Sequence, residues 1–174
     1  MANLLAEILK ITLPSLVVFL TAYLIIRSFF ERQEQQDQQK LKINSQEQLL
    51  PLRLQAYERM ILFLERIHPD NLISRVRESN MTAADLQVAL LKDIRNEYSH
   101  NLSQQLYVSE DAWVLTQNAK EEMIKLINLC YGQVKPDDSA MELTRIIINT
   151  LMQSDKSPTE PAIRYIKQEI GTLF

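Results

Sequence analysis

The densest group of polar side chains in the sequence lies between residues 96 and 107. At helical spacing one face of this segment carries Glu97, His100, Asn101 and Gln104. A carboxylate, an imidazole and two amides in this arrangement could line a small polar pocket or dock a protein or a ligand. They could equally form a buried hydrogen-bond network that satisfies the backbone groups left open at a helix end. The sequence leaves both interpretations open.

Residue types for better-defined chemistry are scattered along the chain. A zinc site needs several Cys, His or carboxylate ligands at short spacing, and His68, His100 and Cys130 are far apart in the sequence. Phosphate-binding loops need clustered glycines, whereas Gly132 and Gly171 are isolated. No nucleophile elbow occurs. We therefore predict no catalytic residue, no cofactor and no metal, and a protein that is not an enzyme; an enzyme with unfamiliar residues is a remaining alternative.

The charge balance argues against a nucleic-acid partner. Nineteen Lys and Arg residues stand against 22 Asp and Glu residues, and the basic ones are dispersed instead of forming a stripe. The single cysteine agrees with a reducing compartment. No small-molecule substrate is indicated by any motif.

Residues 49–174 show apolar side chains at helical spacing, over a length that can bury one core. Five helices are predicted in this body, together with a short helical piece capped by Asp70. Their approximate ranges are 51–67, 82–98, 109–132, 139–151 and 157–171. With no convincing alternating run, the fold class is all-α, a compact helical bundle.

Several residues mark where these helices begin. Thr82 with Asp85 resembles a capping box, and Ser109 and Ser139 are N-cap candidates. Ser157 is followed by a proline at N1 and a glutamate at N3, which is a strong start signal for the last helix. Trp113 is predicted to be a core anchor, the alternative being an exposed hot spot for a partner.

The N-terminus carries sixteen uncharged residues, Ile11 to Ile26, between Lys10 and Arg27. Apolar neighbours extend this run, so residues 4–30 are predicted to be a single transmembrane helix in contact with membrane lipid. A cleaved signal peptide is the rival interpretation, but Glu7 and the absence of a small-residue pair after the run argue against it. The span also lacks pairs of small residues four apart, so it is predicted to be an anchor and not an assembly interface.

The flanking charges predict the orientation of the span. Arg27, Arg32, Lys40 and Lys42 follow it, whereas only Lys10 precedes it. Positive residues collect on the cytoplasmic side, so the N-terminus is expected outside and the body in the cytoplasm. The expected organisation is an anchor (1–30), a polar Gln- and Glu-rich stalk (31–48), helical or flexible, and the helical body (49–174).

Two segments of the body, residues 52–67 and 94–113, resemble a family of uncharacterised membrane-anchored helical proteins from Bacteroidota. The resemblance extends over nearly the whole chain, from the apolar N-terminus through the polar spacer to the helical body. It implies a bacterial inner-membrane setting, and it implies no activity and no functional residue.

These features together favour a non-enzymatic, membrane-tethered scaffold or accessory subunit of a bacterial inner-membrane complex, which binds protein partners through its cytoplasmic bundle. The alternative is a ligand-responsive regulatory module that uses the polar cluster around His100.

Overall fold

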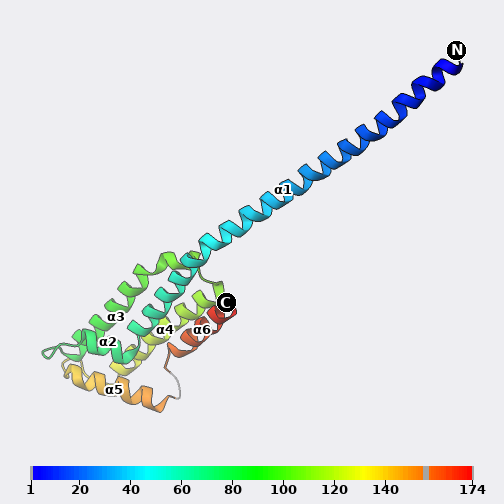
Figure 1. The fold of residues 1–174 in the computed structure, drawn as a ribbon. Helices are drawn as coiled ribbons and strands as arrows, with labels where there is room; N and C mark the ends of the chain where they lie inside the picture. Colours follow the sequence, from blue (N-terminus) through cyan, green and yellow to red (C-terminus); the bar gives the residue numbers. More distant parts are fainter. Residues whose placement is uncertain (1, 155–156, 174) are drawn as a thin grey trace. The chain divides into compact units, whose positions relative to one another are not determined.

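The computed structural model describes residues 2–154 and 157–173, and within the first helix it describes the side chains of residues 16, 18–30, 32, 33 and 48 onwards. Seven helices occur in these ranges (Figure 1): α1 (Ala2–Arg66), α2 (Pro69–Val76), α3 (Ala83–His100), the 3-10 helix η1 (Leu102–Leu106), α4 (Glu110–Tyr131), α5 (Ala140–Gln153) and α6 (Glu160–Leu173). The described residues form no strand; Thr82 and Ser139 form an isolated antiparallel bridge. The predicted all-helical class is confirmed.

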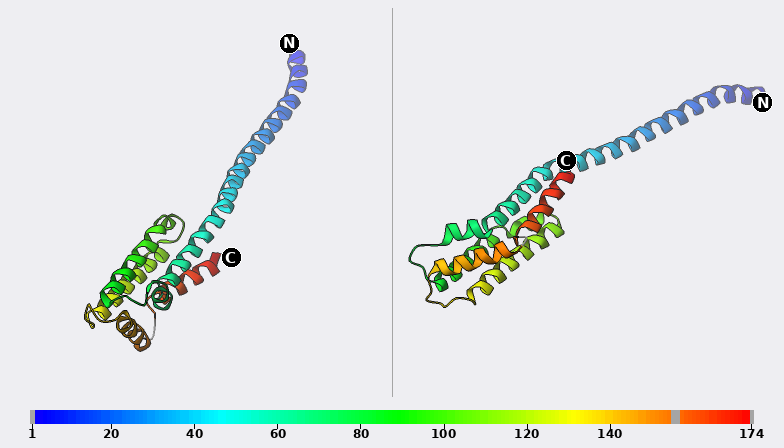
Figure 2. Two further views of the ribbon diagram at one scale, coloured as in Figure 1. Left: turned by 90° about the vertical axis from the view of Figure 1, so that its left-hand side faces the viewer. Right: turned by 90° about the horizontal axis from the view of Figure 1, so that it is seen from below.

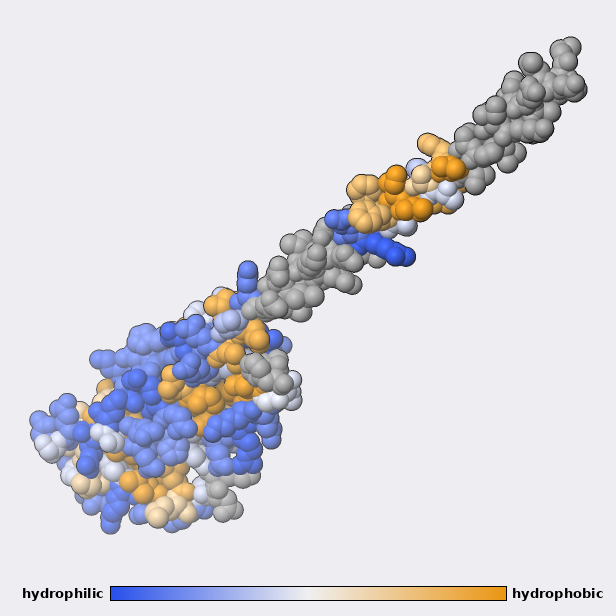
Figure 3. Space-filling model, in the orientation of Figure 1, coloured by the Kyte–Doolittle hydropathy of each residue, from blue (hydrophilic) through white to orange (hydrophobic). Residues whose placement is uncertain are grey.

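The chain divides into two compact units, residues 1–49 and residues 50–174. The described residues of the first unit form helix, and the described apolar side chains between residues 16 and 30 are exposed. Figure 3 colours apolar side chains of this segment orange. Among the described residues we find no helix that meets the length and apolarity required to cross a bilayer. The predicted span also includes residues 4–15 and Val17, whose side chains lie outside the described part of the chain.

The core of the second unit is built around the end of α1. Figures 1 and 2 show this part of α1 running between α3 and α6. Its large, fully buried side chains are Tyr57, Met60, Phe63, Leu64 and Ile67. They pack with buried residues of every other α-helix, among them Leu72, Leu90, Ile127, Leu143 and Ile166. Because these five side chains are buried together with residues of the other helices, the bundle is packed around this segment.

Side-chain caps explain where α3, α4 and α5 begin. The Thr82 hydroxyl accepts from the backbone N–H of Asp85 at 3.2 Å, and the Asp85 carboxylate accepts from the backbone N–H of Thr82 at 3.1 Å. This reciprocal capping box satisfies two otherwise open donors. Ser109 caps α4 and Ser139 caps α5 in the simpler way, through one hydroxyl each. These three predicted starts are confirmed.

Three predicted helix starts are wrong. The helix predicted for 51–67 is the end of α1, which begins at Ala2. α2 begins at Pro69 with His68 at the N-cap, so Asp70 lies inside the first turn and does not cap the helix. The fixed φ of proline suits the first helical position and sets this start. α6 begins at Glu160, not after Ser157, because residues 157–159 form a turn closed by the Glu160 N–H on the Ser157 carbonyl at 3.1 Å.

A core truncation on α3 should separate the buried and exposed faces of this helix. Leu90→Ala removes a side chain with no exposed surface, and we expect it to lower the free energy of unfolding by about 2–5 kcal/mol. Val88→Ala, two residues away on the exposed face, should change it by less than about 0.5 kcal/mol. Urea unfolding followed by circular dichroism measures both, and equal effects would contradict the described helix face.

The capping box should make stability depend on pH. The side-chain hydrogen bond from Thr82, and then the one from its backbone N–H, lower the pKa of Asp85 below its ordinary value. A lowered folded-state pKa gives stability that is present above the unfolded pKa of about 3.9 and is lost as the pH falls through the folded-state pKa. The stability difference between the native chain and Asp85→Asn should therefore shrink on acidification below about pH 4. A difference that stays constant in acid would contradict this role.

Candidate interaction site

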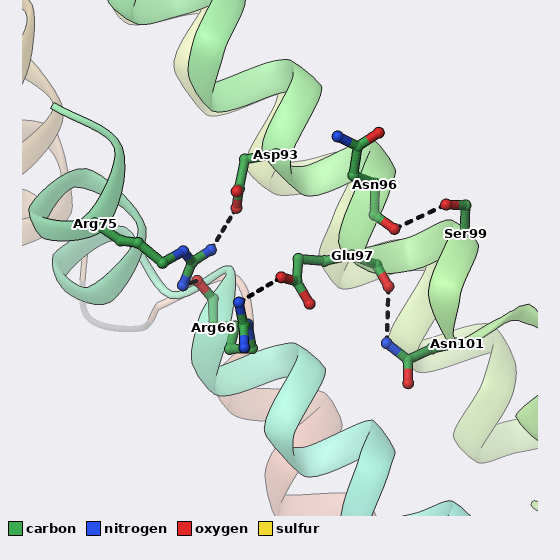
Figure 4. A network of polar contacts seen from close by, with 7 residues as sticks. All are labelled: Arg66, Arg75, Asp93, Asn96, Glu97, Ser99 and Asn101. Atoms are coloured by element: carbon green, nitrogen blue, oxygen red, sulfur yellow. Dashed lines mark hydrogen bonds and ion pairs between the residues drawn. The ribbon is translucent and has the colours of Figure 1, made fainter.

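The four residues of the predicted polar cluster lie at the end of α3 and in η1, but each has its own surroundings. Glu97 forms an ion pair with Arg66 of α1, with 2.6 Å between Oε1 and Nη2 (Figure 4). Asn101 is buried and donates through Nδ2 to the backbone carbonyl of Glu97 at 2.7 Å. Gln104 donates to the Ser103 hydroxyl at 3.3 Å, and His100 is exposed. Glu97 thus makes a contact between two helices, and Asn101 satisfies a backbone group at the end of α3.

A second ion pair lies beside the first (Figure 4). Arg75 of α2 pairs with Asp93, one turn before Glu97 on α3, and its Nη1 donates to the backbone carbonyl of Arg66 at 3.3 Å. Two arginines from α1 and α2 thus meet two carboxylates on one face of α3. Arg66 is half exposed, so the Arg66–Glu97 pair contributes at most about 1 kcal/mol; the pairs chiefly orient α1 and α2 against α3.

The sequence interpretation missed Arg66, Arg75 and Asp93. Asp93 and Glu97 are four residues apart, which indicates a shared helix face, but a sequence does not reveal which basic residues on other helices lie opposite. A hollow of about 370 Å³ opens next to these arginines. It is lined by Leu62, Glu65, Arg66, Asn71, Ser74 and Arg75, and none of the four predicted residues is among them. The predicted ligand pocket around His100 stays a prediction.

Trp113 lies in a group of aromatic rings. It is only 8% exposed and stacks on Tyr98, with ring centroids 5.5 Å apart. The ring centroids of Phe63 of α1 and Tyr98 are 5.9 Å apart, and the Nζ of Lys120 lies 4.1 Å from the centre of the Tyr98 ring. These contacts connect α1, α3 and α4, which is the work of a core anchor.

Ser109 forms a polar junction that the sequence interpretation recognised only as a cap. Its backbone N–H donates to the hydroxyl of the buried Tyr57 at 3.1 Å, and its own hydroxyl lies 2.8 Å from a carboxylate oxygen of Glu169. Nearby, burial first and then the charges of Asp111 and Glu169 raise the pKa of Tyr165. The junction joins α1, α4 and α6 at one end of the bundle.

The remaining reactive residue types have structural surroundings. Burial raises the pKa of the Cys130 thiol, which keeps it protonated and unreactive, and its Sγ lies 3.6 Å from the Thr150 hydroxyl. Within the described ranges, no three His, Cys, Asp or Glu side chains are grouped so that they could hold a metal ion.

The model of a family described as a family of unknown function, DUF7935, matches residues 3–173. Neither the curated proteins nor the solved structures yield a match.

Substitutions at neighbouring positions should distinguish the structural from the binding role of the polar cluster. Asn101→Ala removes a buried donor and leaves the Glu97 carbonyl without its amide partner, so we expect the free energy of unfolding to fall by about 1–2 kcal/mol. His100→Ala, at the adjacent exposed position, should change it by less than about 0.5 kcal/mol. Both values come from urea unfolding. An unchanged stability of Asn101→Ala would instead make this side chain available for a binding role.

Proposed function

We propose that this chain, which belongs to the DUF7935 family of unknown function, is a membrane-tethered helical scaffold, a non-enzymatic accessory subunit of a bacterial inner-membrane complex. In this proposal residues 4–30 anchor the chain in lipid, and the bundle of residues 50–174 lies in the cytoplasm and binds protein partners. The observation that carries the proposal is the band of exposed apolar side chains in the first unit.

This band has the composition of a lipid-facing surface. Its exposed side chains are Leu16, Val18, Phe19, Leu20, Tyr23, Leu24, Ile25, Ile26, Phe29 and Phe30. Phe19 is 70% exposed and the least exposed member, Leu20, is still 51% exposed. Monomeric proteins rarely expose so continuous an apolar surface to water, so a non-aqueous partner is implied. Ten Leu, Ile, Val or Phe residues between 11 and 26 would favour insertion by about 3–6 kcal/mol.

Polar groups within the band are compatible with lipid. The Thr21 hydroxyl donates to the Val18 carbonyl at 3.0 Å, and the Ser28 hydroxyl donates to the Ile25 carbonyl at 2.9 Å. A hydroxyl that returns its hydrogen bond to its own helix lowers the energetic penalty of entering hydrocarbon. The basic residues after Ile26 support a cytoplasmic location of the bundle; Arg27 lies near the end of the band and Arg32 follows it.

The bundle supports a binding role over a catalytic one. Its core residues extend from Ala56 to Ile166, so the second unit buries a complete core by itself. Three of its buried residues with polar side chains, Asn101, Cys130 and Tyr57, form hydrogen-bond contacts within the bundle. In this proposal the function resides in the outer surface of the helices, because scaffolds recognise proteins through such surfaces.

Membrane extraction and topology test the anchor. We expect the full chain to remain in the membrane fraction after alkaline carbonate washing. Leu20→Arg with Leu24→Arg should release it, because two arginines at a helix centre cost about 5–7 kcal/mol, as much as the apolar residues supply. Leu129→Arg, an equally polar change at an exposed position of α4, should leave the chain in the membrane fraction.

The location and the binding role have separate readouts. Protease added to intact spheroplasts should spare the bundle, and protease added to inverted vesicles should digest it. Gentle solubilisation should recover the chain with stoichiometric protein companions. Release of the native chain by carbonate, or digestion from outside, would overturn the tether, and a chain without companions would overturn the scaffold role.

A further inference from the structure

The outer face of α5 carries a regular stripe of exposed side chains. Met141, Arg145, Ile148 and Met152 follow one another at intervals of four, three and four residues. Met152 is 81% exposed, Met141 56% and Ile148 38%. In Figure 3 hydrophobic side chains gather on the surface where Figure 1 places α5. Intervals of three and four residues are those of the contact positions in a paired helix with a heptad repeat. Methionine side chains adapt readily to a facing surface.

Opposite charges stand at the two ends of this stripe, and α2 supplies both. Arg77, the C-cap of α2, places Nη1 2.9 Å from the sulfur of Met141. Asp70, in the first turn of α2, borders a hollow of about 190 Å³ together with Ile148 and Met152. Asp70 and Arg77 are seven residues apart, so they lie on one side of α2, and both are exposed.

We propose that this face, the α5 stripe with Asp70 and Arg77, binds a second copy of the same chain with the two α5 helices antiparallel. The four-three-four spacing reads the same in both directions, so an antiparallel partner is in register along the whole stripe. Each Met141 then meets the partner's Met152, and each Arg145 lies across the partner's Ile148. The same operation brings each Arg77 towards the partner's Asp70. A two-fold interface requires this kind of self-complementarity.

Other charges on this face are compatible with the pairing. Glu142 holds the guanidinium of Arg145 at 2.8 Å, so the stem of Arg145 is left to cover the partner's apolar side chain. His68 lies 3.8 Å from Asp70, and Glu78 lines the hollow of about 260 Å³ next to Met141. Antiparallel helices also align their dipoles favourably. A contact of one helix pair lies at the small end of specific interfaces, so dimerisation should depend on concentration.

Charge substitutions at both methionines test the register. We expect Met141→Glu and Met152→Lys each to weaken dimerisation about tenfold or more, because each places two charges against apolar side chains. The double variant should dimerise at least as well as the native chain, because each new glutamate meets the partner's new lysine. Sedimentation of the full chain in non-ionic detergent, over a range of protein concentrations, measures the association constant and does not depend on membrane insertion.

Val88→Glu is the matched control, since it adds a charge at an exposed position of α3 outside the stripe and should leave the association constant unchanged. Parallel pairing would place the two new glutamates, and the two new lysines, next to each other, so the double variant would be the weakest. A monomeric native chain, dimers insensitive to both single substitutions, or a double variant that fails to recover would each overturn the proposal.

Discussion

Burial of the end of α1 in the middle of the bundle is the contact on which the second unit depends. Tyr57, Phe63 and Leu64 have essentially no exposed surface, and they give α3, α4 and α6 an apolar centre to pack against. The same segment supplies the polar partners that orient its neighbours: the Tyr57 hydroxyl accepts from Ser109, and Arg66 pairs with Glu97. Removal of this segment would leave the remaining helices without a shared core. α1 therefore contributes residues to both units, and its end is required for the core of the second.

The polar groups of the bundle mainly fix how its helices are oriented against one another. Asp93 and Glu97 face arginines from α1 and α2, and Ser109 joins three helices through one hydroxyl and one N–H. Surface ion pairs of this kind add little stability, yet they disfavour other registers of the same apolar surfaces. Glu97 is the residue of the predicted polar cluster that takes part in this orientation, through its ion pair with Arg66.

The exposed apolar band of the first unit and the α5 face differ in character. The band between residues 16 and 30 has exposed apolar side chains on every side of the helix, since it includes the consecutive residues 18–20 and 23–26. The α5 face is narrow, contains an arginine, and has an acid and a base at opposite ends. A non-directional solvent such as lipid suits the first surface, and a partner of defined shape and polarity suits the second.

The sequence by itself determined the helical class, the body as one bundle, and the starts of α3, α4 and α5, because apolar periodicity and capping residues act within a few positions of the chain. It misplaced the starts of α2 and α6, where a proline and a turn compete with a nearby polar cap, and it began a separate helix at residue 51, inside α1. It predicted Glu97, His100, Asn101 and Gln104 on one helix face, whereas α3 ends at His100 and Gln104 lies in η1. Only the tertiary structure decided that Arg66 of α1 takes the Glu97 carboxylate. Partners more than a few turns apart in the chain meet through packing, and packing depends on every helix at once.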